Sequence, residues 1–324
     1  MTRRRRYRVL SLLAYSMLGT SGCYGGEIST AEAPLAPHGD ASVLDRDPFD
    51  AGAPSNDSDA SAPQADQPQV PEGFTLSVYA RDLGNAGILS THGGHVYLTR
   101  PEHGDVLRLV DADRDGGAES YVTELSHLTG VHGIAFHEDT GYVATPNSVY
   151  STLVAADGSL GYPCGIMGEL PDGGQHPQRT LQIGPDHKLY ISVASNPEHT
   201  TILRAELDGS KRTVFARGMQ PTIGFGWHPL THALWGRDQS EWLDLTFYQG
   251  DSFADLYMND AFVAVRGRGV QRMRHHTDNG AIAVEAFVTG VTMDERASVA
   301  VAPDGALLFT DAERGSVYRV QASD

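Results

Sequence analysis

The sequence predicts an all-β protein, a six-bladed β-propeller preceded by an export signal and a linker. Three observations predict this fold. Short runs rich in β-branched and aromatic residues alternate with turn residues, a strand–turn–strand phrase recurs along the chain, and no segment shows sustained helical periodicity with caps. A repeat of about 40–50 residues containing several strands is typical of propeller blades.

The repeated phrase is clearest near the C-terminus, where a strand at 299–302 is followed by the turn Pro303-Asp304-Gly305 and a strand at 306–310. Pro, Asp and Gly in this order favour a tight turn between two strands of one blade. Equivalent positions in the five copies are Thr91, His137, Gly184, His228 and Ala302. The interval between His228 and Ala302 is longer than the others and leaves room for one degenerate copy around residues 261–265. The total is then six units.

The last unit predicts how the ring is closed. It supplies three strands, at 299–301, 307–310 and 317–321, and lacks a fourth. The β-rich run at residues 74–79 has no other partner. We expect it to pair into the last blade, because this pairing removes two open sheet edges.

The N-terminus reads as an export signal over residues 1–23. A basic head from Arg3 to Arg8 precedes a short apolar run, and small residues precede Cys23. The ending resembles a bacterial lipobox, which implies a lipid on Cys23 and an exported lipoprotein of the periplasm or outer membrane. An ordinary cleaved signal with an incidental cysteine is the alternative.

Residues 24–71 read as an acidic, disordered linker rich in Pro, Ala and Ser. They hold nine acidic residues and one basic residue, Arg46, and cannot bury enough apolar surface to offset the cost of ordering. The folded domain is then 72–324. The net charge of −17 argues against nucleic acid as a partner, and any membrane contact would be through the lipid anchor alone.

His176 is the best candidate for chemistry in the sequence. It follows Gly173-Gly174-Gln175 just before a predicted strand, and glycines let a backbone approach a ligand closely. An imidazole can take a proton near neutral pH. The alternative is an exposed loop histidine without a role.

Four parts of the chain resemble the glucose/sorbosone dehydrogenase family. They are the stretch from Gly173 to Val193, the phrase Phe215-Ala216-Arg217-Gly218, the phrase Trp227-His228-Pro229 and the ending 299–320. The resemblance implies a six-bladed propeller that uses pyrroloquinoline quinone (PQQ), often with calcium, to oxidise aldoses or related sugars. It also implies that His176 is the general base that removes a hydroxyl proton while hydride passes to the quinone.

Other positions are expected at the same mouth of the propeller. Gln220 stands, with Pro221, where the family has an Arg-Asn pair that helps to hold the quinone. His132 and Arg296 precede predicted inner strands and are further candidates for binding the cofactor, although each could equally be a structural polar group. The lost Arg-Asn pair supports a second hypothesis, an inactive propeller lipoprotein that binds a carbohydrate or a protein.

Asp111, Asp113 and Asp115 alternate along the chain and are followed by Gly116. This spacing lets three oxygens converge on a hard cation such as Ca²⁺, and Glu119 could add a fourth. A solvated acidic turn is the alternative. The sequence therefore predicts a PQQ-dependent sugar oxidoreductase, with calcium as a second cofactor, a small-molecule sugar as substrate and an unidentified electron acceptor.

Overall fold

The computed structural model describes residues 67–171, 177–196, 199–219, 224–236, 242–275 and 282–323. All of them lie in the second of two units of the chain, Ser61–Asp324. In these ranges the chain forms strands and one short 3-10 helix, η1 (Asp255–Tyr257). No helix in the described ranges is long and apolar enough to span a bilayer.

Five antiparallel sheets have four strands each, and four of these sheets use consecutive strands. The first two comprise β2 (Leu89–His92), β3 (His95–Arg100), β4 (Asp105–Val110) and β5 (Ser120–Leu125), then β6 (Ile134–His137), β7 (Thr140–Ala144), β8 (Val149–Leu153) and β9 (Cys164–Met167). The next two comprise β10 (Leu181–Ile183), β11 (Leu189–Asn196), β12 (His199–Ala205) and β13 (Thr213–Met219), then β16 (Trp242–Phe247), β17 (Ala261–Val265), β18 (Gly269–His275) and β19 (Ile282–Val288).

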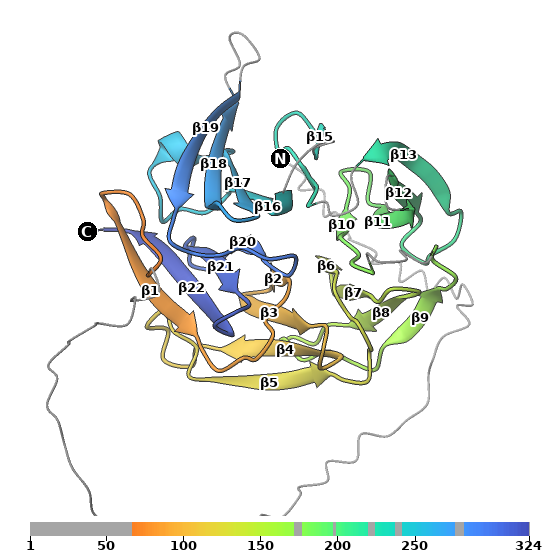
Figure 1. The fold of residues 1–324 in the computed structure, drawn as a ribbon. Coiled ribbons are helices and arrows are strands. Elements are labelled where there is room, and N and C mark those ends of the chain that lie inside the picture. Colours follow the sequence, from red (N-terminus) through yellow and green to blue (C-terminus); the bar gives the residue numbers. More distant parts are fainter. Residues whose placement is uncertain are drawn as a thin grey trace, which may run out of the picture. The chain divides into compact units, whose positions relative to one another are not determined.

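The fifth sheet closes the ring as predicted. It contains β20 (Val299–Val301), β21 (Leu307–Asp311) and β22 (Ser316–Ala322), and its fourth strand is β1 (Phe74–Ala80) from the start of the domain. β1 runs antiparallel to β22, with Phe74 opposite Ala322 and Val78 opposite Tyr318. The first and last strands of the domain therefore lie side by side (Figure 1).

The innermost strands β2, β6, β10, β16 and β20 surround the centre of the ring (Figure 1). Residues of all five strands line a central cavity of about 300 Å³. Their apolar side chains point outward into separate hydrophobic clusters between the sheets; these side chains are Leu89, Ile134, Leu181, Leu245 and Val299. The structure is an all-β propeller with a polar cavity on its axis.

The prediction of six blades is wrong: the described residues form five four-stranded blades. Between the β10 and β16 sheets lies only a two-stranded sheet, β14 (Gly226–Trp227) with β15 (Leu234–Trp235). Residues 261–265, expected to belong to a degenerate copy, are β17, the second strand of the four-stranded β16 sheet, whereas the copy expected around His228 gives only β14 and β15. The predicted repeat missed β16, whose pattern is interrupted by a buried aspartate.

The turn predicted at Pro303-Asp304-Gly305 is present. The Gly305 N–H donates to the Ala302 carbonyl, and the Ala306 N–H donates to the Asp304 side chain. Gly305 has φ of +81°, a left-handed conformation that glycine adopts at little cost. In the corresponding turn between β10 and β11, His187 takes a left-handed conformation with φ of +56°.

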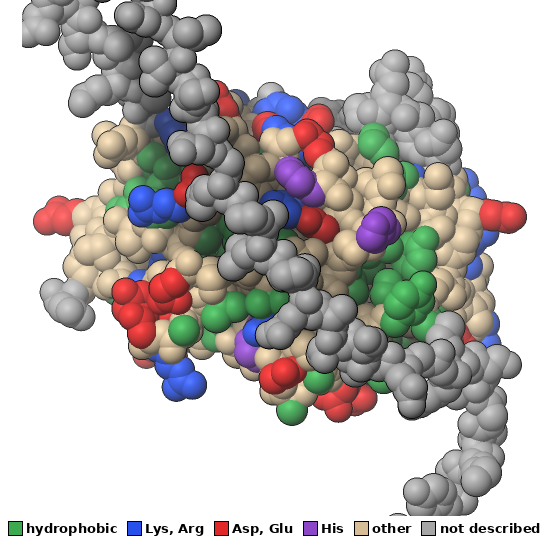
Figure 2. All heavy atoms as spheres, turned by 90° about the horizontal axis from the view of Figure 1, so that it is seen from below, with side chains coloured by type: hydrophobic (Ala, Val, Ile, Leu, Met, Phe, Trp, Pro, Cys, Tyr) green, Lys and Arg blue, Asp and Glu red, His purple; other side chains and the backbone are tan. Residues whose placement is uncertain are grey.

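Charged side chains of both signs lie between hydrophobic patches on the face of the molecule seen from below (Figure 2).

Candidate functional site

Three residues expected from the sequence lie outside the described residues: His176, Gln220 and Cys23. Their roles remain predictions. The site can be built from the other residues at the start of the inner strands, because these positions meet at one mouth of the central cavity. Asp244 lines the cavity, and His132, Arg179 and Arg296 lie just before the inner strands β6, β10 and β20; the sequence reasoning missed Arg179 and Asp244.

His132 lies two residues before the first residue of β6 and is buried, with 5% of its surface exposed. Its carbonyl accepts a hydrogen bond from Thr99 Oγ1, and its Nδ1 lies 3.3 Å from the Arg179 carbonyl oxygen. Because a carbonyl oxygen only accepts, this bond requires the proton on Nδ1. Burial lowers the pKa of His132 to about 4, so the imidazole is neutral at pH 7.

The other ring nitrogen of His132, Nε2, is buried and makes no hydrogen bond of normal geometry among the described residues. The backbone of Glu295 is nevertheless near enough to the ring to raise its pKa, against the larger effect of burial. In the Nδ1–H form Nε2 carries a lone pair and can only accept. A buried polar atom without a partner commonly marks a position for water, an ion or a ligand. A role of His132 in binding a cofactor stays a prediction.

Arg179 is the largest fully buried side chain among the described residues. Its Nη1 donates to the Gln178 carbonyl at 2.9 Å, and its Nη2 donates to the Pro171 carbonyl at 2.8 Å. Pro171 and Gln178 flank residues 172–176, so one guanidinium holds both ends of the segment that carries His176. The sequence signal was an arginine three residues after the predicted base, directly before an inner strand.

Arg296 lies three residues before β20, and its charge is already balanced by two acids. Its Nη2 lies 2.5 Å from Asp294 Oδ2, and its Nη1 lies 3.0 Å from Glu102 Oε1. The hydrogen bond to Asp294 raises the pKa of Arg296. A ligand with carboxylates would have to compete with both acids for this guanidinium.

Asp244, the third residue of β16, lines the central cavity and is 6% exposed. Ser298 Oγ donates to its Oδ2 at 2.5 Å, and the backbone N–H groups of Val299 and Leu245 donate to the carboxylate as well. Burial raises the pKa of Asp244 to about 6, against the effect of these three donors. Asp244 is the one ionisable side chain among the described residues that line this cavity.

These buried groups join neighbouring sheets in a continuous series, which we call the mouth belt. Asp244 accepts from Ser298, whose Oγ accepts from the Leu89 N–H of β2. Thr99 Oγ1 accepts from the Ile88 N–H and donates to the His132 carbonyl. His132 then donates to Arg179. The mouth belt thus runs from β16 through β20, β2 and β6 to β10.

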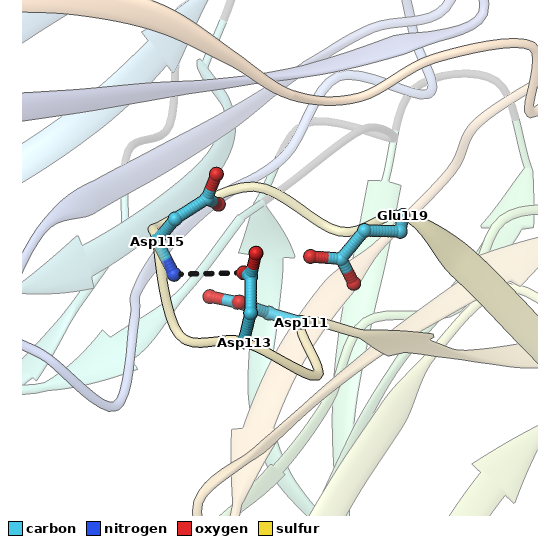
Figure 3. Close-up of side chains that lie close together, drawn as sticks. All are labelled: Asp111, Asp113, Asp115 and Glu119. Carbon is cyan, nitrogen blue, oxygen red and sulfur yellow. Dashed lines mark hydrogen bonds between the residues drawn. The ribbon is translucent and has the colours of Figure 1, made fainter.

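The four predicted calcium ligands come together in the turn between β4 and β5 (Figure 3). One carboxylate oxygen from each of Asp111, Asp113, Asp115 and Glu119 lies within 4.8 Å of the others. Backbone N–H groups order the turn: Gly116 donates to Asp111, and Ala112 donates to Glu119. The cluster is mostly exposed and lies in a turn that joins two outer strands, whereas the central cavity is lined by inner strands.

No protein-family model and no curated protein sequence matches this chain. Solved structures do match. The calcium structure of a Trichoderma reesei enzyme of carbohydrate-active family AA12 is 14% identical, with a TM-score of 0.63, and the alignment covers 80% of this chain and 98% of that one. The holo PQQ domain of Coprinopsis cinerea pyranose dehydrogenase is 12% identical, with a TM-score of 0.57 and coverage of 79% and 97%.

The PQQ-bound aldose sugar dehydrogenase of Streptomyces coelicolor is 15% identical, with a TM-score of 0.54 and coverage of 79% and 100%. At these identities the likeness concerns the fold. The resemblance predicted from the sequence is therefore confirmed at the level of the fold, and residues 67–323 have the propeller fold of the PQQ-dependent sugar dehydrogenases.

Proposed function

We propose that this chain is a sugar oxidoreductase that uses PQQ at the mouth of the central cavity. The observation that supports the proposal is the propeller fold shared with two PQQ-holding sugar dehydrogenases, together with the buried His132 before the inner strand β6, whose Nε2 has no hydrogen-bond partner among the described residues. The substrate class is a small aldose or related sugar. The electron acceptor is left unassigned.

The hydrogen-bonding groups of the described residues suit a bound quinone better than their charges do. His132 Nε2 could accept a hydrogen bond from a ligand, and Arg179 fixes the ends of the segment that carries His176. Arg296, in contrast, is paired with two acids. Gln220 would add hydrogen bonding without a cation.

The proposed chemistry divides between the cofactor and the chain. Bound PQQ would supply an acceptor for hydride from a sugar carbon. His176 would take the proton from the sugar hydroxyl as general base, and its ordinary pKa near 6.5 suits this role at neutral pH. His132 stays neutral at pH 7 and would orient a ligand rather than carry a proton.

The test measures binding and turnover separately. Titration of the full-length chain with PQQ, with and without CaCl₂, is followed by calorimetry, and dye reduction is then measured with a panel of aldoses. Saturable binding at micromolar PQQ and sugar-dependent reduction are expected. His176→Asn should bind PQQ and lose at least about 100-fold in kcat, the usual contribution of a general base. His187→Asn, at an exposed turn, should keep full activity. Absence of PQQ binding in the wild-type chain would refute the proposal.

One observation favours a second function, a propeller that binds a carbohydrate or protein without catalysis. The charge of Arg296 is neutralised by Asp294 and Glu102. This arginine is therefore not free to stabilise the negative charge of a reduced quinone. In that case sugar binding would persist in calorimetry while dye reduction is absent at every PQQ concentration.

Calcium binding at the Asp111–Glu119 turn and lipid attachment at Cys23 complete the proposal. Calcium at this turn would be structural, because the turn joins two outer strands. A lipid on Cys23 would hold the protein on a bacterial membrane after export. Cys23→Ser should move the protein from the membrane fraction to the soluble fraction, and retention of the variant in membranes would argue against lipidation.

A further inference from the structure

The central cavity has the composition of a cation site rather than of an apolar pore. Alternate residues of a strand face the same side, so Thr246 shares the cavity side of β16 with Asp244. Ser90 of β2 and Gln182 of β10 also line the cavity. The half-buried side chains of Ser90, Gln182 and Thr246 make no hydrogen bond with other described residues. Their oxygens are therefore available to water or an ion.

The hydrogen bonds of Asp244 suit its ionised form. Its Oδ1 accepts from the Leu245 N–H, and its Oδ2 accepts from the Val299 N–H and from Ser298 Oγ. Ser298 Oγ already accepts from the Leu89 N–H, so its own proton is free to be donated to Asp244. If the Asp244 carboxyl were protonated, its proton would lie beside other hydrogen-bond donors, which is unfavourable. The geometry thus fixes a negative charge inside the ring.

This charge lacks a counter-charge within the described part of the chain. No Lys, Arg or His among the described residues lines the cavity, and Asp244 forms no ion pair there. The two arginines at the mouth are engaged elsewhere, Arg179 with the Pro171 and Gln178 carbonyls and Arg296 with Asp294 and Glu102. A buried carboxylate without a partner is costly unless it is protonated or binds a cation.

We propose that the central cavity binds one alkali cation, Na⁺ or K⁺, held by the Asp244 carboxylate and by neutral oxygens of Thr246, Ser90 and Gln182. One carboxylate with hydroxyl and amide oxygens balances a single positive charge. Calcium sites in proteins generally combine several carboxylates, as the Asp111 turn does. At the roughly 30 Å³ that a water occupies in the liquid, the cavity has room for an ion and several waters. This inference is independent of the proposed sugar chemistry.

Thermal unfolding of the full-length chain at pH 8 tests the proposal. The midpoint is compared in NaCl, KCl and choline chloride at equal ionic strength, since the methyl groups around the charge of choline keep it from taking oxygen ligands as closely as an alkali ion does. An alkali salt at ten times its dissociation constant should raise the midpoint by about 2–4 °C over choline chloride. Asp244→Asn should abolish the difference, and Thr246→Val should reduce it. Asp113→Asn, at the outer turn, should leave it unchanged.

Two results would overturn the proposal: equal midpoints in all three salts, or an alkali response that survives in Asp244→Asn. A response to CaCl₂ alone that disappears in Asp113→Asn would assign the metal to the outer turn and leave the cavity without a cation. If Asp244→Asn does not fold, crystals of the wild-type chain soaked in Rb⁺ decide the matter. An anomalous peak beside the Asp244 carboxylate supports the site, and an empty cavity at saturating Rb⁺ refutes it.

Discussion

From β16 through β20, β2 and β6 to β10, neighbouring sheets are joined by the buried polar groups of the mouth belt. Between the β10 and β16 sheets, in contrast, β14 and β15 contribute mainly aromatic side-chain contacts among the described residues. Tyr190 packs on Trp227 at a ring-centroid distance of 4.8 Å, and Trp235 packs on Phe247 at 5.3 Å. Polar bonds fix register and orientation, while aromatic contacts tolerate small displacements. A propeller can thus lose most of one blade and still be closed by side chains.

The largest effect is expected where backbone pairing closes the ring. A chain that begins at residue 81 lacks β1, which leaves the β22 edge open and removes Phe74 from its contacts with Phe253 and Phe287. We expect this chain to lose cooperative unfolding in urea. A chain that begins at residue 67 keeps β1 and should retain it. Equal urea midpoints for the two chains would show that β1 is dispensable.

His132 should make the protein sensitive to acid, and Asp244 should oppose this effect. His132 has a pKa of about 4 in the native state and near 6.5 when unfolded, so between these values the unfolded chain binds more protons. This histidine should therefore lower the free energy of unfolding as the pH drops from 6.5 to 4, by about 3 kcal/mol, whereas Asp244, whose native pKa is raised to about 6, should raise that free energy over part of the same range. Urea unfolding of His132→Gln, compared with the wild-type chain at each pH, should lack the loss that His132 causes. The exposed control His103→Gln should keep it, and an unchanged profile in His132→Gln would assign the acid sensitivity to other groups.

The aromatic junction should depend on ring packing rather than on polar bonds. Trp227→Leu removes contacts with Tyr190 and Phe215 and should cost about 2 kcal/mol, at the low end for a large aromatic because Trp227 is only half-buried. Trp227→Phe keeps an aromatic ring and removes an indole N–H that is buried without a partner, so it should be nearly neutral. Urea midpoints compare the two, and a larger loss for Phe than for Leu would contradict a packing role.

The smallest effect is expected at the acidic turn, which lies outside both junctions. Without calcium, Asp113→Asn should leave the free energy of unfolding nearly unchanged, since the residue is exposed. With millimolar CaCl₂ the wild-type chain should gain stability and the variant should not. Calorimetric titration with CaCl₂ checks both. An equal calcium response in the two proteins would place the metal elsewhere.

Sequence reasoning predicted the blades whose strands are short, apolar and separated by a Pro-Asp-Gly type of turn. The partner of residues 74–79 was also predictable, because the last unit was one strand short and an open edge is unfavourable. The blade count was wrong because the copy around His228, counted as a full blade, forms only the two-stranded sheet of β14 and β15 among the described residues. Two-residue strands such as β14 and β15 carry too little pattern to separate a full blade from a hairpin.

The candidate site was predictable only in part. His132 and Arg296 precede inner strands, so their place at the mouth followed from the repeat. The acids that neutralise Arg296 come from residues 102 and 294, a pairing that depends on the folded ring. Arg179 and Asp244 were missed because both are charged residues in buried positions, where the surrounding partners that make burial tolerable are distant in the sequence.

The pairing of β1 with β22 has a consequence for how the domain is made. Residues 74–80 leave the ribosome more than two hundred residues before their partners at 316–322, and until then their edge is open to other chains. A chaperone that covers this early strand would be needed for as long as synthesis lasts. The same adjacency brings the Ser323 N–H within 2.8 Å of the Gly73 carbonyl, so a circular permutant could join the two ends by a short loop and begin in any turn between blades.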